Sequence, residues 1–170
     1  TICLYFANQG KPFFFQIRPG KNEKLFKIIK FKTMNDKIDE NGNLLSDAER
    51  LTKVGTFVRK TSIDELPQLI NVFIGDMSIV GPRPEVRHYV DFWTPEQMHV
   101  LDVRPGITDP ASIKFRNENE LLAHTEEPEK YYIEIIMQEK LKLYLDYVKN
   151  QSFFYDIKLI FQTFWVIITE

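Results

Sequence analysis

Apolar and polar residues alternate near the start of the chain, and this alternation predicts a β-hairpin over residues 12–34. Phe13, Phe15 and Ile17 fall on one face of the first strand because successive strand residues point to opposite faces. Pro-Gly-Lys-Asn at 19–22 is a turn signal, and the segment after it reads as the returning strand.

Further along the chain, the apolar spacing changes to that of amphipathic helices. The first predicted helix begins at Asp64 and ends at Gly75, a residue typical of a C-terminal cap. The second runs from Pro128 to about Lys149, and the third begins after Ser152, which is a good N-cap. The three apolar stripes consist of Leu66, Leu69, Ile70 and Phe73; of Ile133, Met137, Leu141, Tyr144, Leu145 and Val148; and of Ile157, Ile160, Phe161, Phe164 and Ile168.

The last predicted helix is more apolar than one core-facing stripe requires. Phe153, Phe154 and Trp165 widen its apolar face. Two environments fit such a helix: the protein core, under the apolar face of the hairpin, or a membrane surface. We expect the membrane surface, because a tryptophan suits the headgroup level of a bilayer.

Length and composition indicate one globular domain, residues 1–170, of the α+β class. We expect the N-terminal hairpin to pack on several helices, with loops rich in proline and glycine around a site. A net charge of −2 and the absence of a basic aromatic stripe argue against nucleic-acid binding. Cys3 is the only cysteine, so no disulfide framework is expected. The acidic loop at 35–50 lacks the spacing of a calcium loop.

Two adjacent carboxylates, Asp64 and Glu65, stand just before Pro67. One interpretation is structural: Ser62 and Glu65 have the spacing of a capping box. That interpretation places Pro67 beyond the first helical turn, where its ring crowds a carbonyl. A helix that starts at Asp64 avoids the clash and leaves both acids at its N-terminus. Such a pair can hold a divalent cation, and one of its members can attack an electrophile.

Four arginines lie in or near loops marked by proline or glycine. Guanidinium groups match phosphate oxygens in two places at once, although arginines near acids more often form ordinary salt bridges. One of the four stands between two prolines at 82–84, which stiffen the backbone around it. The four are Arg59, Arg83, Arg104 and Arg116. From the residues alone, the site holds an acid pair, arginines and, by hypothesis, a metal and a phosphate.

Nearly the whole chain resembles the bacterial sugar transferases, the monotopic phosphoglycosyl transferases. "PFFFQIRPGKNEKLFKIIKFKTM" at 12–34 is similar to their opening hairpin. "RLTKVGTFVRKTSIDELPQLINVFIGDMSIVGPRPE" at 50–85 is similar throughout to their central signature. "VRPGIT" at 103–108 and "DYVKNQSFFYDIKLIFQTFWVII" at 146–168 resemble their C-terminal blocks.

The resemblance implies transfer of a sugar 1-phosphate from a nucleotide diphospho-sugar, usually a UDP-sugar, to a polyprenyl phosphate, with release of UMP. It implies Mg²⁺ as the cofactor and a covalent phosphosugar intermediate on Asp64. Glu65 is then its partner, in metal binding or in orienting the nucleophile. The substrate-binding arginines would be Arg59, Arg83, Arg104 and Arg116.

The family resemblance also implies a place in the cell, the cytoplasmic face of the bacterial inner membrane. The chain begins with Thr1, so we expect that the family's N-terminal membrane segment precedes it. Two departures concern the site: Lys32 replaces an arginine of the family pattern, and "DPASIKFRNE" at 109–118 replaces Gly-Trp-Ala-Gln, which leaves the sugar open. The alternative functions are a catalytically silent scaffold of a glycan-assembly complex and a metal-dependent nucleotide-sugar hydrolase.

Overall fold

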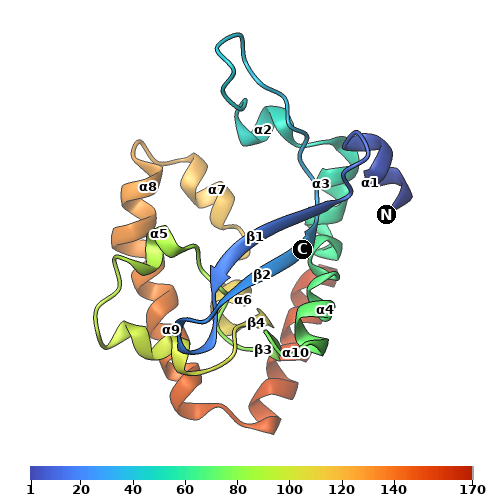
Figure 1. Ribbon diagram of the computed structural model, residues 1–170. Helices are drawn as coiled ribbons and strands as arrows, with labels where there is room; N and C mark the ends of the chain where they lie inside the picture. The colour runs from blue at the N-terminus through green and yellow to red at the C-terminus, as the bar shows by residue number, and fades with distance from the viewer. Residues whose placement is uncertain (170) are drawn as a thin grey trace. The chain divides into compact units, whose positions relative to one another are not determined.

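The computed structural model describes residues 1–169, apart from the side chain of Asn119 (Figure 1). It is 54% helical and 14% strand, with an antiparallel hairpin near the N-terminus that packs against helices. The predicted α+β class and the predicted hairpin are therefore confirmed.

The chain folds into two compact units. Unit 1 consists of Thr1–Gln16 and Lys27–Asn71, and unit 2 consists of Ile17–Phe26 and Val72–Glu170. The chain passes between the units within the hairpin and again after Asn71. The prediction of a single catalytic domain stays a prediction.

The hairpin consists of β1, Phe13–Pro19, and β2, Leu25–Phe31, joined by a short 3₁₀ turn, η1, at Lys21–Glu23. Its open end belongs to unit 1 and its tip to unit 2. Phe13, Phe15 and Ile17, which share one face of β1, are exposed, whereas Gln16 and Arg18 on the other face are half-buried. The apolar face of β1 therefore does not form the core.

Besides its part of the hairpin, unit 1 contains three short helices, a 3₁₀ turn and most of a fourth helix, α4, whose end at Val72 and Phe73 belongs to unit 2. The bounds are α1 Ile2–Ala7, α2 Asp47–Arg50, α3 Lys53–Lys60, η2 Ile63–Glu65 and α4 Gln68–Phe73. The predicted helix from Asp64 is broken, because η2 and α4 are separate elements on either side of Pro67. Gly75, the predicted cap, has a φ of +88°, which glycine adopts without strain.

Helix α4 turns its polar face inward, contrary to the usual pattern. Gln68 and Asn71 are each only 1% exposed. Asn71 accepts from the backbone N–H of Ile29 at 3.1 Å and donates to the carbonyl of Lys27 at 2.9 Å. The side chain thus bonds to β2 as a neighbouring strand would. The predicted apolar stripe of this helix is exposed: Leu66, Leu69, Ile70 and Phe73.

Unit 2 contains a two-stranded parallel sheet surrounded by helices. The two strands approach closely, since a Cβ on Gly106 would lie 2.1 Å from the nitrogen of Gly81. The bounds are β3 Ser78–Val80, α5 Arg87–Val90, η3 Gln97–Asp102, β4 Gly106–Thr108, α6 Pro110–Lys114, α7 Glu118–Ala123, α8 Pro128–Tyr131, the π-helical η4 Tyr132–Ile136, α9 Met137–Asn150 and α10 Phe153–Thr169.

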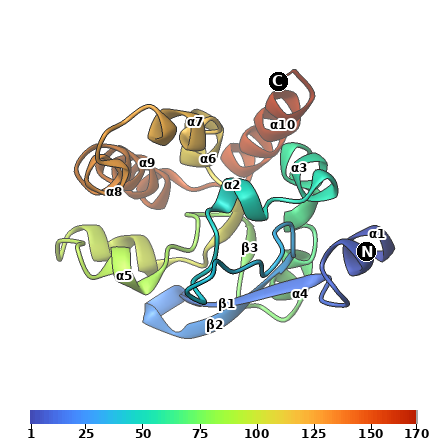
Figure 2. The ribbon, with the colours of Figure 1, turned by 90° about the horizontal axis from the view of Figure 1, so that it is seen from above.

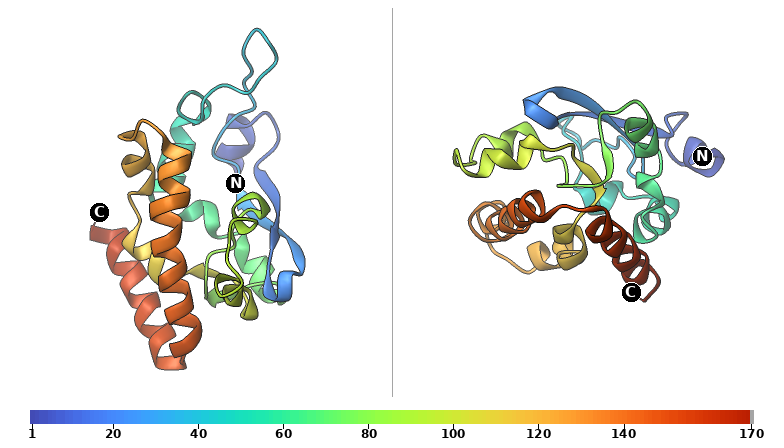
Figure 3. Two further views of the ribbon diagram at one scale, coloured as in Figure 1. Left: turned by 90° about the vertical axis from the view of Figure 1, so that its left-hand side faces the viewer. Right: turned by 90° about the horizontal axis from the view of Figure 1, so that it is seen from below.

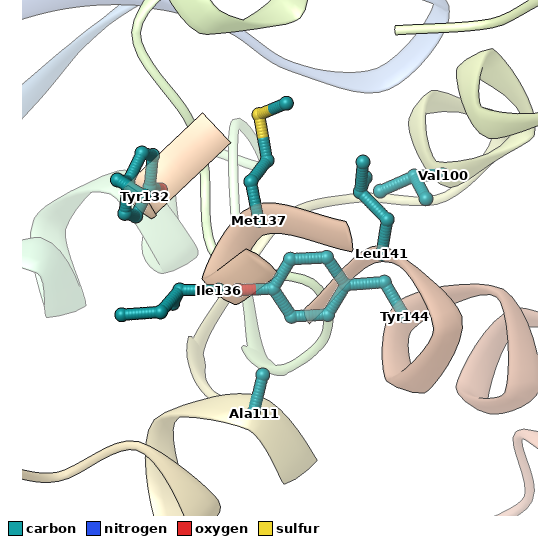
Figure 4. Packing of buried hydrophobic residues seen from close by; sticks show 7 residues of the cluster. All are labelled: Val100, Ala111, Tyr132, Ile136, Met137, Leu141 and Tyr144. Atoms are coloured by element: carbon teal, nitrogen blue, oxygen red, sulfur yellow. The ribbon is translucent and has the colours of Figure 1, made fainter. Parts of the chain in front are cut away.

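The second predicted helix is confirmed, with Pro128 in its first turn. It runs through α8, η4 and α9, and Figure 2 views this helix nearly end-on. The π-helical turn within it was not predicted. Its inward side supplies most of a buried cluster, which Figure 4 shows: Val100, Ala111, Tyr132, Ile136, Met137, Leu141 and Tyr144.

Helix α10 begins after Ser152, whose hydroxyl accepts from the N–H of Tyr155, so the predicted N-cap is confirmed. The helix lies alongside α9 (Figure 3). Leu159 is its buried contact, whereas six large apolar side chains are 60–82% exposed. These are Phe153, Phe154, Phe161, Phe164, Trp165 and Ile168. The core alternative for this face is therefore wrong. Over residues 1–169, no helix has the length and apolar character needed to cross a bilayer.

Candidate active site

The acid pair lies in η2, between α3 and α4 of unit 1. Ser62, just before it, has a φ of +55° and makes no capping hydrogen bond with its side chain. The capping-box interpretation of Ser62 and Glu65 is therefore wrong. The left-handed Ser62 instead ends one helix and starts a tight turn that carries Asp64 and Glu65. A capping box does occur in unit 1, at Ser46 and Glu49 of α2.

Glu65 forms an ion pair with Lys30 of β2, with 2.8 Å between Nζ and Oε1. The two side chains are 18% and 15% exposed. At that burial, an unpaired carboxylate would be costly, so the lysine fixes both the charge and the position of Glu65. Sequence reasoning missed Lys30. Its partner Glu65 lies 35 residues further along the chain, so no local pattern marks the pair.

Arg59 lies in the last turn of α3, and its Nε donates to the hydroxyl of Thr33 at 2.9 Å. Thr33 also holds the start of α3, since its carbonyl accepts from the N–H and the hydroxyl of Thr52. Gly55 is required there, because an added Cβ would lie 2.0 Å from the Thr33 oxygen. Thr33 therefore contacts both ends of α3, the helix that carries Arg59 and leads into the turn with the acid pair.

The predicted arginines of unit 2 come from three places. Arg83 is half-buried in the loop after β3, Arg104 is exposed just before β4, and Arg116 is half-buried between α6 and α7. The loops of the first two meet, since Gly106 N–H donates to the Pro82 carbonyl at 3.0 Å. These three arginines belong to unit 2, whereas the acid pair belongs to unit 1.

A small cavity adjoins the loop of Arg83. Its volume of about 10 Å³ has room for roughly one water. Four prolines and two valines give it rigid apolar walls, and Arg83 is its charged member. The lining residues are Pro19, Pro82, Arg83, Pro84, Val100, Leu101, Val103 and Pro105.

The segment that departs from the family pattern forms α6, with Asp109 as its N-cap. Asp109 is fully buried and accepts from the backbone N–H of Ser112 at 2.7 Å and from the Ser112 hydroxyl. Burial raises the pKa of Asp109, while the bonds from Ser112 and the nearby charges of Arg83 and Lys140 oppose that rise. The aspartate at this position is thus a structural cap of the helix.

Lys32, the other departure, forms an ion pair with Asp36 at 2.5 Å. Within residues 1–169, no cluster of three or more histidine, cysteine or carboxylate side chains is arranged to hold a metal. Asp64 and Glu65 are adjacent carboxylates that could hold a metal together with oxygens of a substrate. Mg²⁺ is commonly bound in this way, through one or two carboxylates plus phosphates.

Comparison with known proteins decides the family. The model of the family described as "Bacterial sugar transferase" matches residues 1–170. This chain belongs to the bacterial sugar transferase family. Its resemblance to the family, first inferred from the segments at 12–34, 50–85, 103–108 and 146–168, is thereby confirmed.

Among similar bacterial sugar transferases, the uncharacterized sugar transferase EpsL of Bacillus subtilis (strain 168) is 44% identical over 94% of this chain and 72% of its own length. A UDP-glucose:undecaprenyl-phosphate glucose-1-phosphate transferase of Escherichia coli (strain K12) is 38% identical over 96% of this chain. The enzyme of the same name from Caulobacter vibrioides is 33% identical over 96% of this chain. The chain spans only 34% and 59% of the lengths of these last two relatives.

Proposed function

We propose that this chain is a phosphoglycosyl transferase, which moves a sugar 1-phosphate from a UDP-sugar to a polyprenyl phosphate and releases UMP. The family match over residues 1–170, with Asp64 and Glu65 intact, is the observation that carries the proposal. Relatives named as UDP-sugar:undecaprenyl-phosphate sugar-phosphate transferases support the same donor and acceptor classes.

In the proposed mechanism, a carboxylate oxygen of Asp64 attacks the phosphorus that bears the sugar. The P–O bond to UMP breaks, UMP leaves with the electron pair, and the sugar phosphate stays on Asp64. A phosphate oxygen of the polyprenyl acceptor then attacks the same phosphorus, and the bond to Asp64 breaks. The products are the polyprenyl diphospho-sugar and the regenerated carboxylate.

Glu65 and Lys30 prepare the acid pair for this chemistry. Two adjacent carboxylates repel each other, and the ion pair with Lys30 at 2.8 Å neutralises Glu65 locally. Asp64 is then the carboxylate that attacks, with Glu65 held beside it by Lys30. Asp64 and Glu65 would hold Mg²⁺, which supplies positive charge against the phosphate oxygens when bound.

The arginines have the complementary task of binding the phosphates. An anionic nucleophile is repelled by the anionic oxygens around phosphorus, and guanidinium groups offset that repulsion. Nε of Arg59 donates to the Thr33 hydroxyl, and the two terminal nitrogens of the guanidinium take no part in that bond. We assign phosphate binding to Arg59, Arg83, Arg104 and Arg116.

The acceptor implies that the protein works at the surface of a membrane, because a polyprenyl tail does not leave the bilayer. The exposed apolar face of α10 supports contact with that surface, since single apolar patches of this kind are uncommon on proteins that face only water. We place the protein at the cytoplasmic face of the bacterial inner membrane, where UDP-sugars are available.

The test is release of UMP from a panel of UDP-sugars, with and without undecaprenyl phosphate. We expect the parent to release UMP beyond a first turnover only when the acceptor is present. Asp64→Asn, which is nearly isosteric, should release no UMP. UMP release at the parent rate by Asp64→Asn would exclude Asp64 as the nucleophile. Sustained sugar-phosphate release without acceptor would identify a hydrolase, and no release with any donor would favour a scaffold.

Lysine replacements test the arginines. Arg59→Lys and Arg116→Lys keep the charge but lose the bidentate fork, so we expect each to lower kcat/KM by about 10-fold or more. Parent rates in both variants would show that these arginines serve only as salt-bridge partners.

A further inference from the structure

The loop around Arg83 is held from both sides by contacts within unit 2. On one side, the Pro82 carbonyl accepts from Gly106 N–H at 3.0 Å. On the other, the Pro84 carbonyl accepts from Nη1 of Arg18 at 2.9 Å. Proline has no N–H to donate, so the backbone of Pro82 and of Pro84 can be fixed by hydrogen bonds only through the carbonyl.

Glu85, next to the loop, connects this second anchor to the helices. Its Oε1 lies 3.5 Å from Nη1 of Arg18 and accepts from the N–H of Val86 at 2.9 Å. Its Oε2 accepts from the hydroxyl of Tyr132 at 2.5 Å. Both carboxylate oxygens are therefore bonded, and charge-assisted bonds of this kind are stronger than neutral ones.

Tyr132, one partner of Glu85, is buried and packed against other side chains. Tyr132 is 6% exposed and begins the π-helical turn η4, a feature often found near functional sites. Its ring centroid is 4.7 Å from that of Tyr89 and 5.1 Å from Nζ of Lys140. Burial and the charge of Glu85 raise the pKa of Tyr132, so its hydroxyl keeps its proton for the bond.

We infer that Arg18, Glu85 and Tyr132 form a clamp that positions Arg83 for the phosphates of the nucleotide-sugar donor. The inference rests on the proposed function, and it adds three positioning residues to it. None of the three is assigned a contact with substrate. They act by fixing the backbone from which Arg83 projects, so that its planar fork meets two oxygens without first losing conformational freedom.

The experiment compares Tyr132→Phe with the parent in donor kinetics. The variant loses one hydroxyl and keeps the ring in the buried cluster. We expect its KM for the UDP-sugar to rise about five- to tenfold, with kcat within about twofold, because a binding group is displaced. Tyr131→Phe, the exposed neighbour in α8, is the matched control and should leave KM unchanged.

A double variant separates positioning from a general structural effect. If Tyr132 acts through Arg83, adding Tyr132→Phe to Arg83→Ala should change KM by less than about twofold. A full five- to tenfold rise in that background would overturn the clamp. So would an unchanged KM in the single variant. Glu85→Gln, which keeps an acceptor for Tyr132, should raise KM for the UDP-sugar less than Glu85→Ala does.

A readout without turnover distinguishes failure of the clamp from failure of the proposed function. The Nε–Hε NMR signal of Arg83, assigned by its loss in Arg83→Lys, should shift in Tyr132→Phe and stay in place in Tyr131→Phe. An unmoved signal overturns the clamp. If the parent releases no UMP while the signal shifts, the proposed function fails and the clamp stands.

Discussion

Asn71 provides the most direct test of why α4 turns its polar face inward. Asn71→Ala removes both bonds to β2, the one from Ile29 N–H at 3.1 Å and the one to the Lys27 carbonyl at 2.9 Å. A buried backbone group left without a partner costs about 1–3 kcal/mol. Both bonds are only part-buried, so water reduces the penalty, and we expect a loss of about 2–4 kcal/mol in the free energy of unfolding.

The assay is urea unfolding followed by circular dichroism, together with hydrogen exchange at the amide of Ile29. That amide should exchange at least about 10-fold faster in Asn71→Ala, because its acceptor is gone. Asn41→Ala, in an exposed loop of the same unit, is the control. If Asn71→Ala is as stable as this control and Ile29 exchanges at the parent rate, the strand-like role of Asn71 is refuted.

Three further predictions concern the acid pair, a buried aspartate and α10. Lys30→Gln should destabilise the protein by about 1–3 kcal/mol and lower UMP release. Adding Glu65→Gln to Lys30→Gln should recover stability without recovering activity. Equal stability of the single and the double variant would contradict the ion pair. Asp109 has a raised pKa, so the folded state binds its proton more tightly than the unfolded state does, and the free energy of unfolding falls as pH rises through and above the ordinary pKa range of an aspartate; Asp109→Asn should remove this fall, and urea titrations in which parent and variant lose stability equally as pH rises would contradict this. With Trp93→Phe, the fluorescence of Trp165 should shift to the blue on adding anionic vesicles, and a spectrum insensitive to vesicles would remove α10 from the membrane surface.

Local patterns in the sequence predicted several elements correctly. The alternation and the turn at 19–22 predicted the hairpin, and Pro128 and Ser152 marked the starts of two helices. Gly75 was correctly read as a cap from its tolerance of positive φ. These features depend on backbone preferences and on hydrogen bonds between residues near in sequence, so the sequence alone determines them. The dyad and arginine motifs likewise pointed to the family without any coordinates.

The orientation of the apolar faces was decided only by the tertiary structure. Periodicity shows that α4 and β1 have two faces, and the usual assumption places the apolar face inside. Here Asn71 bonds to β2, so the polar face of α4 is buried and Phe73 is 92% exposed. The side-chain amide of Asn71 makes two hydrogen bonds to β2 in place of a neighbouring strand, and a hydropathy pattern does not reveal such bonds.

The partners of the site residues also required the fold. Lys30 meets Glu65 across 35 residues, Glu85 meets Tyr132 across 47, and Arg18 meets the Pro84 carbonyl across 66. The sequence by itself indicated which residues are candidates for the chemistry, because the dyad and the arginines lie in recognisable local motifs. Only the fold decided which distant side chains neutralise and fix them, because such pairs depend on the path of the chain between them and leave no periodic signal in the sequence.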